Sequence, residues 1–389
     1  MTTQSGYKVD TTRGQHRGEV SAQWFSRPDD QKFLTLDDLY AFTKARRDES
    51  SAEVIDASGI RFEAQRDEPE DLKILLPRER ASAEPLHVEP THWSFGQVAS
   101  LLGAPASYLR KLPAPIAAIN LQYHANNYAS EKVKSLVRVN GATELRAVTG
   151  AEYGRIWDSD VVDAVRRVAG DTWKVPGVID WATQYYNAES LVTKESTTLY
   201  ASDRDVFLFL VDDRHPIEVG KLATGEPDLM FRGFYVWNSE TGSKTFGLAA
   251  MYLRAVCQNR NLWGVENFQE LKFRHSSGAP SRFMRECLPA LQSYANHGTD
   301  TLIAGVKAAK AAIVANTDDT RTDWLARQGF GKKQSADIIA TVLREEQKKP
   351  ESIWDFVQGI TAYARKVPHA DDRVEMEARA GALLDKVTA

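Results

Sequence analysis

Aromatic and basic side chains gather between residues 206 and 275. On the stretch LMFRGFYVWN, Phe231, Tyr235 and Trp237 alternate to one face of a predicted strand, and Arg232 and Phe234 to the other. Rings and cations together suit single-stranded nucleic acid, because every base has a stackable face and every nucleotide a phosphate. A packed sheet face with cations at its margin has the same composition and remains the alternative. The candidate nucleic-acid contacts are Arg232, Lys244, Arg254, Arg260, Lys272 and Arg274, with Phe234, Tyr235 and Trp237 as rings.

The sequence lacks the usual signatures of phosphate loops, dinucleotide binding, serine hydrolysis and zinc proteolysis. Paired carboxylates could hold the divalent cations of a nuclease, but each also has a structural explanation at a helix start or a turn. We therefore predict no catalytic residue, no metal site and no cofactor, and keep a metal-dependent nuclease as a minor alternative. The carboxylates concerned are Asp158, Asp160, Asp163, Asp212, Asp213, Asp318 and Asp319.

The composition is that of a globular protein. The chain has 389 residues, of which 42% are hydrophobic and 26% charged, and its length suggests two or three domains or one elaborated domain. The apolar run at 206–211 is far shorter than the roughly 20 residues of a membrane helix, and the N-terminus does not resemble a secretory signal. Two cysteines, Cys257 and Cys287, give no disulfide framework. We expect a cytoplasmic protein without membrane contact.

Charge is unevenly distributed along the chain, whose net charge is -4. Residues 1–90 hold 13 basic and 18 acidic residues, whereas residues 230–287 hold 8 basic and 4 acidic ones. A local excess of cations is what a nucleic-acid groove needs, although a solvated protein face can carry it equally well.

The first 127 residues predict an irregular acidic layer followed by a helical hairpin. Within 1–90 we expect a helix at 36–46 and a strand at 72–76. Residues 91–127 predict two helices around Gly103, with Pro113 and Pro115 closing the second. Ala99, Gly103 and Leu109 fit a helix-turn-helix pattern, but a purely structural hairpin fits equally common residue types.

From about residue 132 the pattern changes to strands, expected at 135–139, 144–148, 191–200, 206–211, 229–237 and 244–248, with a helix at 159–168. A hairpin with Gly242 in its turn leads into a predicted helix over LAAMYLRAVCQN, and residues beyond Pro280 predict helices. We therefore predict an α+β fold. Its units are an irregular acidic N-terminal layer (1–90), a helical hairpin (91–127), a core with a central antiparallel sheet and hairpin-helix unit (128–279), and a C-terminal helical region (280–389).

Four strings carry a family resemblance: AVTGAEYGRIWDSDVVDAV, GFYVWNSETGSKTFGLAAMYLRAVCQN, LKFRHSSG and WDFVQGITAYARKVPHADDRVEMEARAGALL. Together they resemble the phage/plasmid-like proteins gathered as family 932 of the domains of unknown function. The resemblance implies a mobile-element protein in a bacterial cytoplasm and transfers no catalytic residues. The order of strands, hairpin and long helix is also similar to the core of single-strand-annealing recombinases such as Redβ, RecT and Erf, which form rings on single strands without a cofactor.

Two functional hypotheses follow. The first is a cofactor-independent protein that binds and anneals single-stranded DNA as a homo-oligomer. The second is a module that binds a host protein, such as a defence factor, because the chain outside residues 230–287 is acidic and can present a DNA-like charge.

Overall fold

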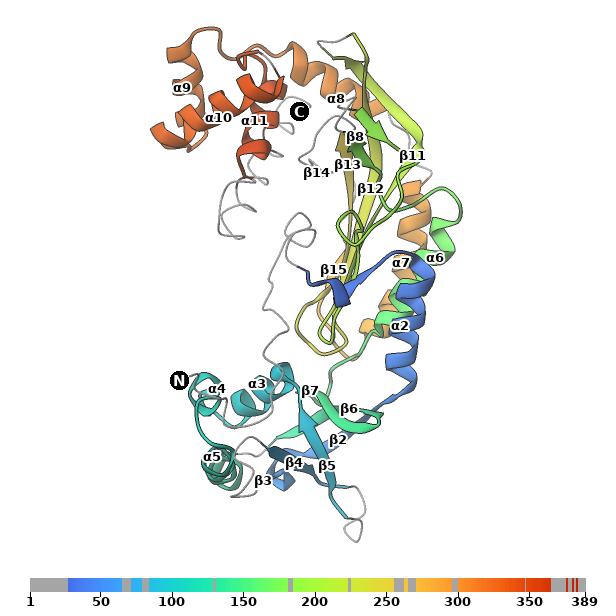
Figure 1. Cartoon of the computed structure of the whole chain (residues 1–389), viewed down its shortest axis with the longest axis vertical. Coiled ribbons are helices and arrows are strands. Elements are labelled where there is room, and N and C mark those ends of the chain that lie inside the picture. Colours follow the sequence, from blue (N-terminus) through green and yellow to red (C-terminus); the bar gives the residue numbers. More distant parts are fainter. Residues whose placement is uncertain are drawn as a thin grey trace.

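The computed structural model describes residues 27–64, 71–78, 84–128, 131–180, 185–222, 225–254, 262–264, 271–295, 300–346 and 348–364, with Met376, Ala380 and Leu383. The described elements form an elongated crescent (Figure 1). A small sheet with three helices occupies one end, a sheet of long strands the middle, and a group of helices the other end. Helices and antiparallel strands occur in both halves, so the predicted α+β class is confirmed.

Residues 50–150 contain the strands of a six-stranded sheet, in the order β2-β6-β7-β5-β4-β3. Its strands are β2 (Ser50–Asp56), β3 (Arg61–Ala64), β4 (Leu72–Leu76), β5 (Leu86–Pro90), β6 (Lys132–Asn140) and β7 (Ala142–Gly150). The predicted strand at 72–76 is thus confirmed. The expected irregular layer is instead largely sheet, and strands from both sides of residue 90 pair in it, because β5 runs parallel to β7.

Three helices cover this sheet: α3 (His92–Leu101), α4 (Ala106–Leu109) and α5 (Ala114–Tyr128). Gly103 has a φ of 68° and makes the turn after α3, as expected for a glycine between helices. The predicted two-helix hairpin is wrong in one respect. Pro113 and Pro115 start the long α5 rather than end the second helix, which suits proline because the first turn of a helix needs no backbone donors. The α4 segment is one turn long, too short for a recognition helix.

The central sheet has seven strands, all paired antiparallel, in the order β1-β10-β11-β12-β13-β14, with β15 also paired to β13. They are β1 (Lys32–Phe33), β10 (Leu199–Ala201), β11 (Val206–Lys221), β12 (Pro227–Asn238), β13 (Phe246–Arg254), β14 (Leu262–Gly264) and β15 (Leu271–Phe273). A two-stranded ribbon, β8 (Val178–Asp180) and β9 (Tyr185–Asn187), lies apart from this path. The strand expected at 191–200 is short, beginning at Leu199.

The predicted helix after the hairpin is wrong, because its described part is the strand β13. Leu248 and Ala250 are buried in the core beneath the helices, while Leu253 is buried on the opposite face. A strand buried on both sides is apolar throughout and loses its period-two signal, so it resembles a helix in sequence.

Helices α2 (Leu36–Asp48), α6 (Asp158–Ala169) and α7 (Ala279–Ala295) lie along one face of the long strands (Figure 1). The helices predicted at 36–46 and 159–168 are thereby confirmed. Thr35 caps α2 by accepting from the backbone N–H of Asp38, and Asp37 and Asp38 complement the positive end of the helix. Short 3-10 turns occur at Asp29–Gln31 and Ala57–Gly59.

The C-terminal helical region is confirmed over its described part. It comprises α8 (Asp300–Ala311), α9 (Asp318–Arg327), α10 (Lys332–Glu346) and α11 (Ile353–Ala364), which share a core with β11, β12 and β13. The sequence predicts helix to the end of this region, but most residues after Ala364 lie outside the described residues. Among the described helices, none is long and apolar enough to cross a bilayer.

Candidate nucleic-acid interface

The two faces of β12 carry different chemistry. Phe234 points into the core beneath the helices, where its ring centroid lies 5.0 Å from that of Trp173. Phe231, Tyr235 and Trp237 belong to a cluster on the opposite face, as their alternation predicted. We call this opposite face the aromatic face; its described cluster members all belong to strands: Tyr186, Tyr200, Phe207, Phe209, Val211, Leu229, Phe231, Tyr235, Trp237 and Leu253.

One cross-strand row of the aromatic face joins rings to cations. Residues directly opposite each other in an antiparallel pair share a face of the sheet, so the register of five strand pairs defines the row. The row crosses six strands at one end of the sheet, immediately before the β12–β13 turn. Its members in order are Lys32, Tyr200, Phe207, Trp237, Gly247 and Lys272.

The rings of this row stack with their neighbour Tyr235. The Tyr235 and Trp237 centroids are 5.4 Å apart at an interplanar angle of 22°, and those of Phe207 and Tyr235 are 6.1 Å apart at 27°. Phe207 and Tyr200 are buried, whereas Tyr235 and Trp237 are half-buried. Of the rings in this row and beside it, Tyr235 and Trp237 are therefore the ones that can offer a surface to a base.

The predicted cations do not all share this face. Lys272 lies in the row, and its side chain and that of Arg274 are exposed. Lys244 is half-buried in the β12–β13 turn, with its ammonium 2.6 Å from Asp205. Arg232 is half-buried on the helix-covered face, opposite Tyr252 in the ladder.

Two predicted contacts, Arg254 and Phe234, are removed from the candidate set, and a third, Arg260, stays a prediction. Arg254 is 3% exposed, and its guanidinium lies 2.7 Å from Asp228 and 3.0 Å from Glu346, so it joins the sheet to the C-terminal helices. Phe234 is 1% exposed in the helix-covered core and has no surface for a base. Arg260 lies outside the described residues.

A network of buried charges lies where the central sheet meets the six-stranded sheet. Arg146 of β7 is 2.5 Å from Glu240 of the β12–β13 turn, and both side chains are almost fully buried. Asp205 accepts two hydrogen bonds from Arg27, at 2.8 and 2.9 Å; despite its burial, these and the Lys244 ammonium lower its pKa. Burial and the nearby Glu240 raise the pKa of Asp158 well above its usual range. The Arg146–Glu240 pair ties β7 to the β12–β13 turn and so helps to fix how the two sheets meet, whereas the contacts of Asp205 join the β10–β11 turn to the segment before β1 and to the β12–β13 turn.

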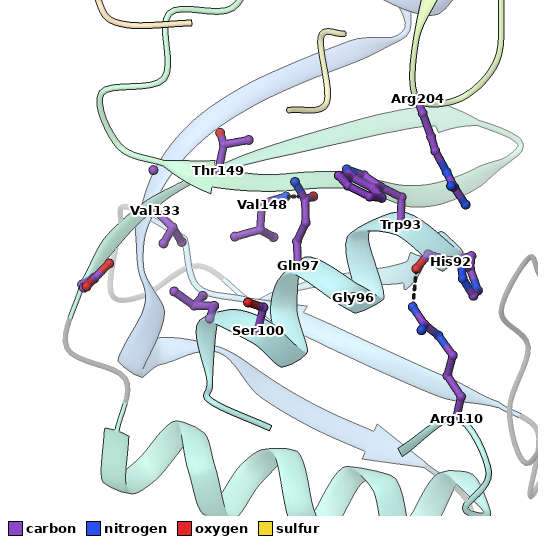
Figure 2. Close-up of a pocket in the computed structure, with 13 residues that line it drawn as sticks. His92, Trp93, Gly96, Gln97, Ser100, Arg110, Val133, Val148, Thr149 and Arg204 are labelled. Atoms are coloured by element: carbon purple, nitrogen blue, oxygen red, sulfur yellow. Dashed lines mark hydrogen bonds between the residues drawn. The ribbon is translucent and has the colours of Figure 1, made fainter. Parts of the chain in front are cut away.

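The sequence analysis missed the pocket beside this junction. It has a volume of about 520 Å³ and lies between α3, the edge of β6 and β7, and Arg204 of the β10–β11 turn (Figure 2). Trp93 and Gln97 of α3 donate to the carbonyl of Thr241 at 3.1 and 2.9 Å, which fastens the β12–β13 turn to α3. The sequence gives only a weak indication of this junction: hydroxyl side chains stand at every second position of the β12–β13 turn, at Ser239, Thr241 and Ser243.

Those hydroxyls hold the backbone of Arg204 in position. The side-chain oxygens of Ser239, Thr241 and Ser243 surround the Arg204 carbonyl oxygen at 2.6, 3.0 and 3.1 Å. The guanidinium carbon of Arg204 then lies 5.5 Å from the ring centroid of Trp93, within cation–π distance.

Most of the carboxylates considered for metal binding take part in local contacts. Asp158 accepts from Asn238, Asp160 binds Arg47, and Asp213 binds Lys174. Within the part of the chain that the structure describes, no group of three or more potential metal-ligating His, Cys, Asp or Glu side chains comes together.

Comparison with known proteins gives one match. A family model described as "Domain of unknown function (DUF932)" matches residues 167–379, more than half of the chain. No curated protein and no solved structure matches the chain significantly. The matched segment contains β10 to β15 and helices α7 to α11. It therefore includes most of the aromatic face and the C-terminal helices that pack against the central sheet. The chain belongs to the DUF932 family.

Proposed function

We propose that the aromatic face binds single-stranded nucleic acid. The observation that carries the proposal is the row in which Trp237 lies between Phe207 on one side and Gly247 and Lys272 on the other. Neighbouring strands are spaced by about 4.8 Å, so the six members span about 24 Å across the sheet. A strand of nucleic acid laid along the row meets half-buried rings and, at its β15 end, an exposed ammonium.

Stacking explains why the rings favour single strands over duplexes. A base can lie on Tyr235 or Trp237 only when it is unpaired and turned out of a duplex stack. Each such contact contributes about 1–3 kcal/mol and is tolerant of sequence, since every base has a π face. We therefore expect binding with little base preference.

Phosphate contacts would come from the margins of the row. Lys272 and Arg274 are exposed at one end, and Lys32 lies at the other, 2.9 Å from the carboxylate of Asp29. The overall charge of -4 means that binding depends on these local cations rather than on bulk attraction. Annealing of complementary strands by a homo-oligomer is the finer form of the proposal, and rings and cations require no cofactor for it.

Fluorescence anisotropy with a labelled 30-nucleotide poly-dT strand, its duplex with poly-dA, and several salt concentrations tests the proposal. We expect preference for the single strand and a loss of affinity as salt rises. Lys272→Ala should flatten the slope of log affinity against log salt by about 0.7. Lys307→Ala, which removes an exposed lysine of α8, is the matched control and should leave the slope unchanged. No binding by the folded wild-type protein would contradict the proposal.

A further inference from the structure

The pocket beside α3 has the features of a second binding site. Its volume of about 520 Å³ falls in the range of small-molecule sites, and its lining comes from α3, from β6 and β7, and from Arg110 and Arg204. Its lining combines two arginines, Arg110 and Arg204, with the indole of Trp93 and the apolar Val133 and Val148. This inference is independent of the proposed function, because the aromatic face is formed by other residues.

The two guanidinium groups approach the same end of the pocket. Figure 2 shows Arg204 and Arg110 entering from opposite sides, with both guanidinium groups directed towards the turn that carries His92. Arg110 donates to the carbonyl of His92 at 2.8 Å and lies over the ring of Phe95 at 5.3 Å. Both guanidinium groups are cations that line one pocket, so their charges attract an anion into it. The positive end of α3, which starts at His92, adds to the effect.

The side chain of Arg110 explains why a glycine stands at position 96 in α3. Glycine within a helix costs about 1 kcal/mol relative to alanine. At Gly96 a Cβ atom would lie 3.2 Å from Nη2 of Arg110, a tight contact that the guanidinium would relieve by shifting a few tenths of an ångström. The missing side chain thus gives the Arg110 guanidinium room to cross α3 and reach the carbonyl of His92.

We propose that this pocket binds a nucleoside phosphate, with Arg204 and Arg110 holding the phosphate and the apolar part of the lining holding the nucleoside. Guanidinium groups are suited to phosphate oxygens because their planar donors bind in pairs. The volume exceeds what inorganic phosphate alone would fill. Glu131 also lines the pocket, so it is not uniformly positive, which favours a ligand whose charge is confined to one end. The source of the group is either a free nucleotide or the 5′-phosphate of a strand.

Isothermal titration calorimetry with dAMP, deoxyadenosine and inorganic phosphate tests the pocket. We expect dAMP to bind more tightly than either fragment. Arg204→Gln should weaken dAMP binding about ten- to hundredfold, the effect of losing charge-assisted hydrogen bonds. Gly96→Ala, which keeps both arginines but displaces Arg110, should weaken it less. Arg285→Gln, on the exposed surface of α7, is the matched control and should bind as the wild type does.

A second arm separates the two sources and the two proposals. A 5′-phosphorylated oligonucleotide that binds more tightly than its 5′-hydroxyl form, with the gain lost in Arg204→Gln, identifies a strand end; no gain alongside dAMP binding identifies a free nucleotide. Failure of wild type to bind dAMP, or equal dAMP binding by wild type, Arg204→Gln and Gly96→Ala, overturns the pocket assignment. Binding of the 5′-hydroxyl strand reports on the aromatic face alone, so either proposal can fail while the other stands.

Discussion

The indole of Trp237 lies against Gly247, its partner in the β12–β13 ladder, so closely that a Cβ atom at Gly247 would come within 1.8 Å of the ring. Glycine weakens a strand because it packs nothing and loses more backbone entropy on folding. Here the ring of Trp237 fills the space beside it. The position of the central ring of the row therefore depends on the absence of a side chain on the next strand.

Gly247→Ala should displace the Trp237 ring without removing it. We expect single-strand affinity to fall about tenfold, the scale of one lost stacking contact. Overpacking should also lower the free energy of unfolding by about 1–3 kcal/mol. Anisotropy and urea denaturation measure the two effects. Gly331→Ala is the control, because this glycine is exposed and the nearest atom to its added Cβ is Oε1 of Gln334 at 3.6 Å, an ordinary contact; an unchanged affinity in Gly247→Ala would show that the ring position is irrelevant to binding.

Arg254→Ala should destabilise the join between the central sheet and the C-terminal helices. Asp228 is fully buried and lies 2.7 Å from both Arg254 and Lys310 of α8, so removing one cation leaves a carboxylate poorly compensated. Breaking a buried ion pair costs about 3–5 kcal/mol. Urea denaturation should show a lower midpoint, while Arg282→Ala, an exposed pair with Glu286, should change little. Equal midpoints for wild type and Arg254→Ala would refute this structural role.

His275 should make the fold sensitive to acid. Its ring stacks on Tyr153 at 4.8 Å, and burial, with the nearby Arg155, lowers its pKa from 6.5 to about 4. Between pH 6.5 and pH 4, His275 is protonated in the unfolded chain and neutral in the folded chain. The stabilisation is therefore present above pH 6.5 and lost as pH falls towards 4, by up to about 3 kcal/mol. Between pH 7 and pH 4.5, the free energy of unfolding should fall less for His275→Gln than for wild type. Equal falls in the two proteins would contradict the role assigned to His275.

Asp158→Asn should have the opposite pH signature. Burial and the nearby Glu240 raise the pKa of Asp158, so above the ordinary pKa of 3.8 the folded chain retains a proton that the unfolded chain releases. Stability therefore falls as pH rises through that window. The amide keeps the acceptor that receives the Asn238 hydrogen bond of 2.8 Å. We expect Asp158→Asn to be more stable than wild type at pH 8 and about equally stable at pH 4. Asp171→Asn, at an exposed aspartate, is the control, and a destabilised Asp158→Asn at pH 8 would refute the assignment.

Local signals were sufficient for much of the fold. The cap and charges around 36–46, the alternation at 229–237 and the periodicity of the C-terminal helices each predicted an element that the structure contains. The strand β13 was mistaken for a helix because both its faces are buried and its apolar residues do not alternate. Most of the sheet within the first 90 residues was missed, in part because β2 and β5 pair with β6 and β7, which lie far along the chain.

The candidate sites were less predictable than the fold. The shared face of Phe231, Tyr235 and Trp237 followed from alternation, but the fate of Arg254 did not, because its partners lie on β12, α10 and α11. The pocket brings together residues near 92–110 with Arg204, and no spacing rule links them.

Photo-cross-linking of a poly-dT strand substituted with 5-iododeoxyuridine tests the central claim most directly, because this base cross-links to rings on which it stacks. Peptide mapping of the irradiated complex should place the cross-links at Tyr235 or Trp237, and Trp237→Ala should lose those that map to Trp237. Cross-links confined to other segments, in a complex that still prefers single strands, would show that nucleic acid binds elsewhere and that the aromatic face serves only packing.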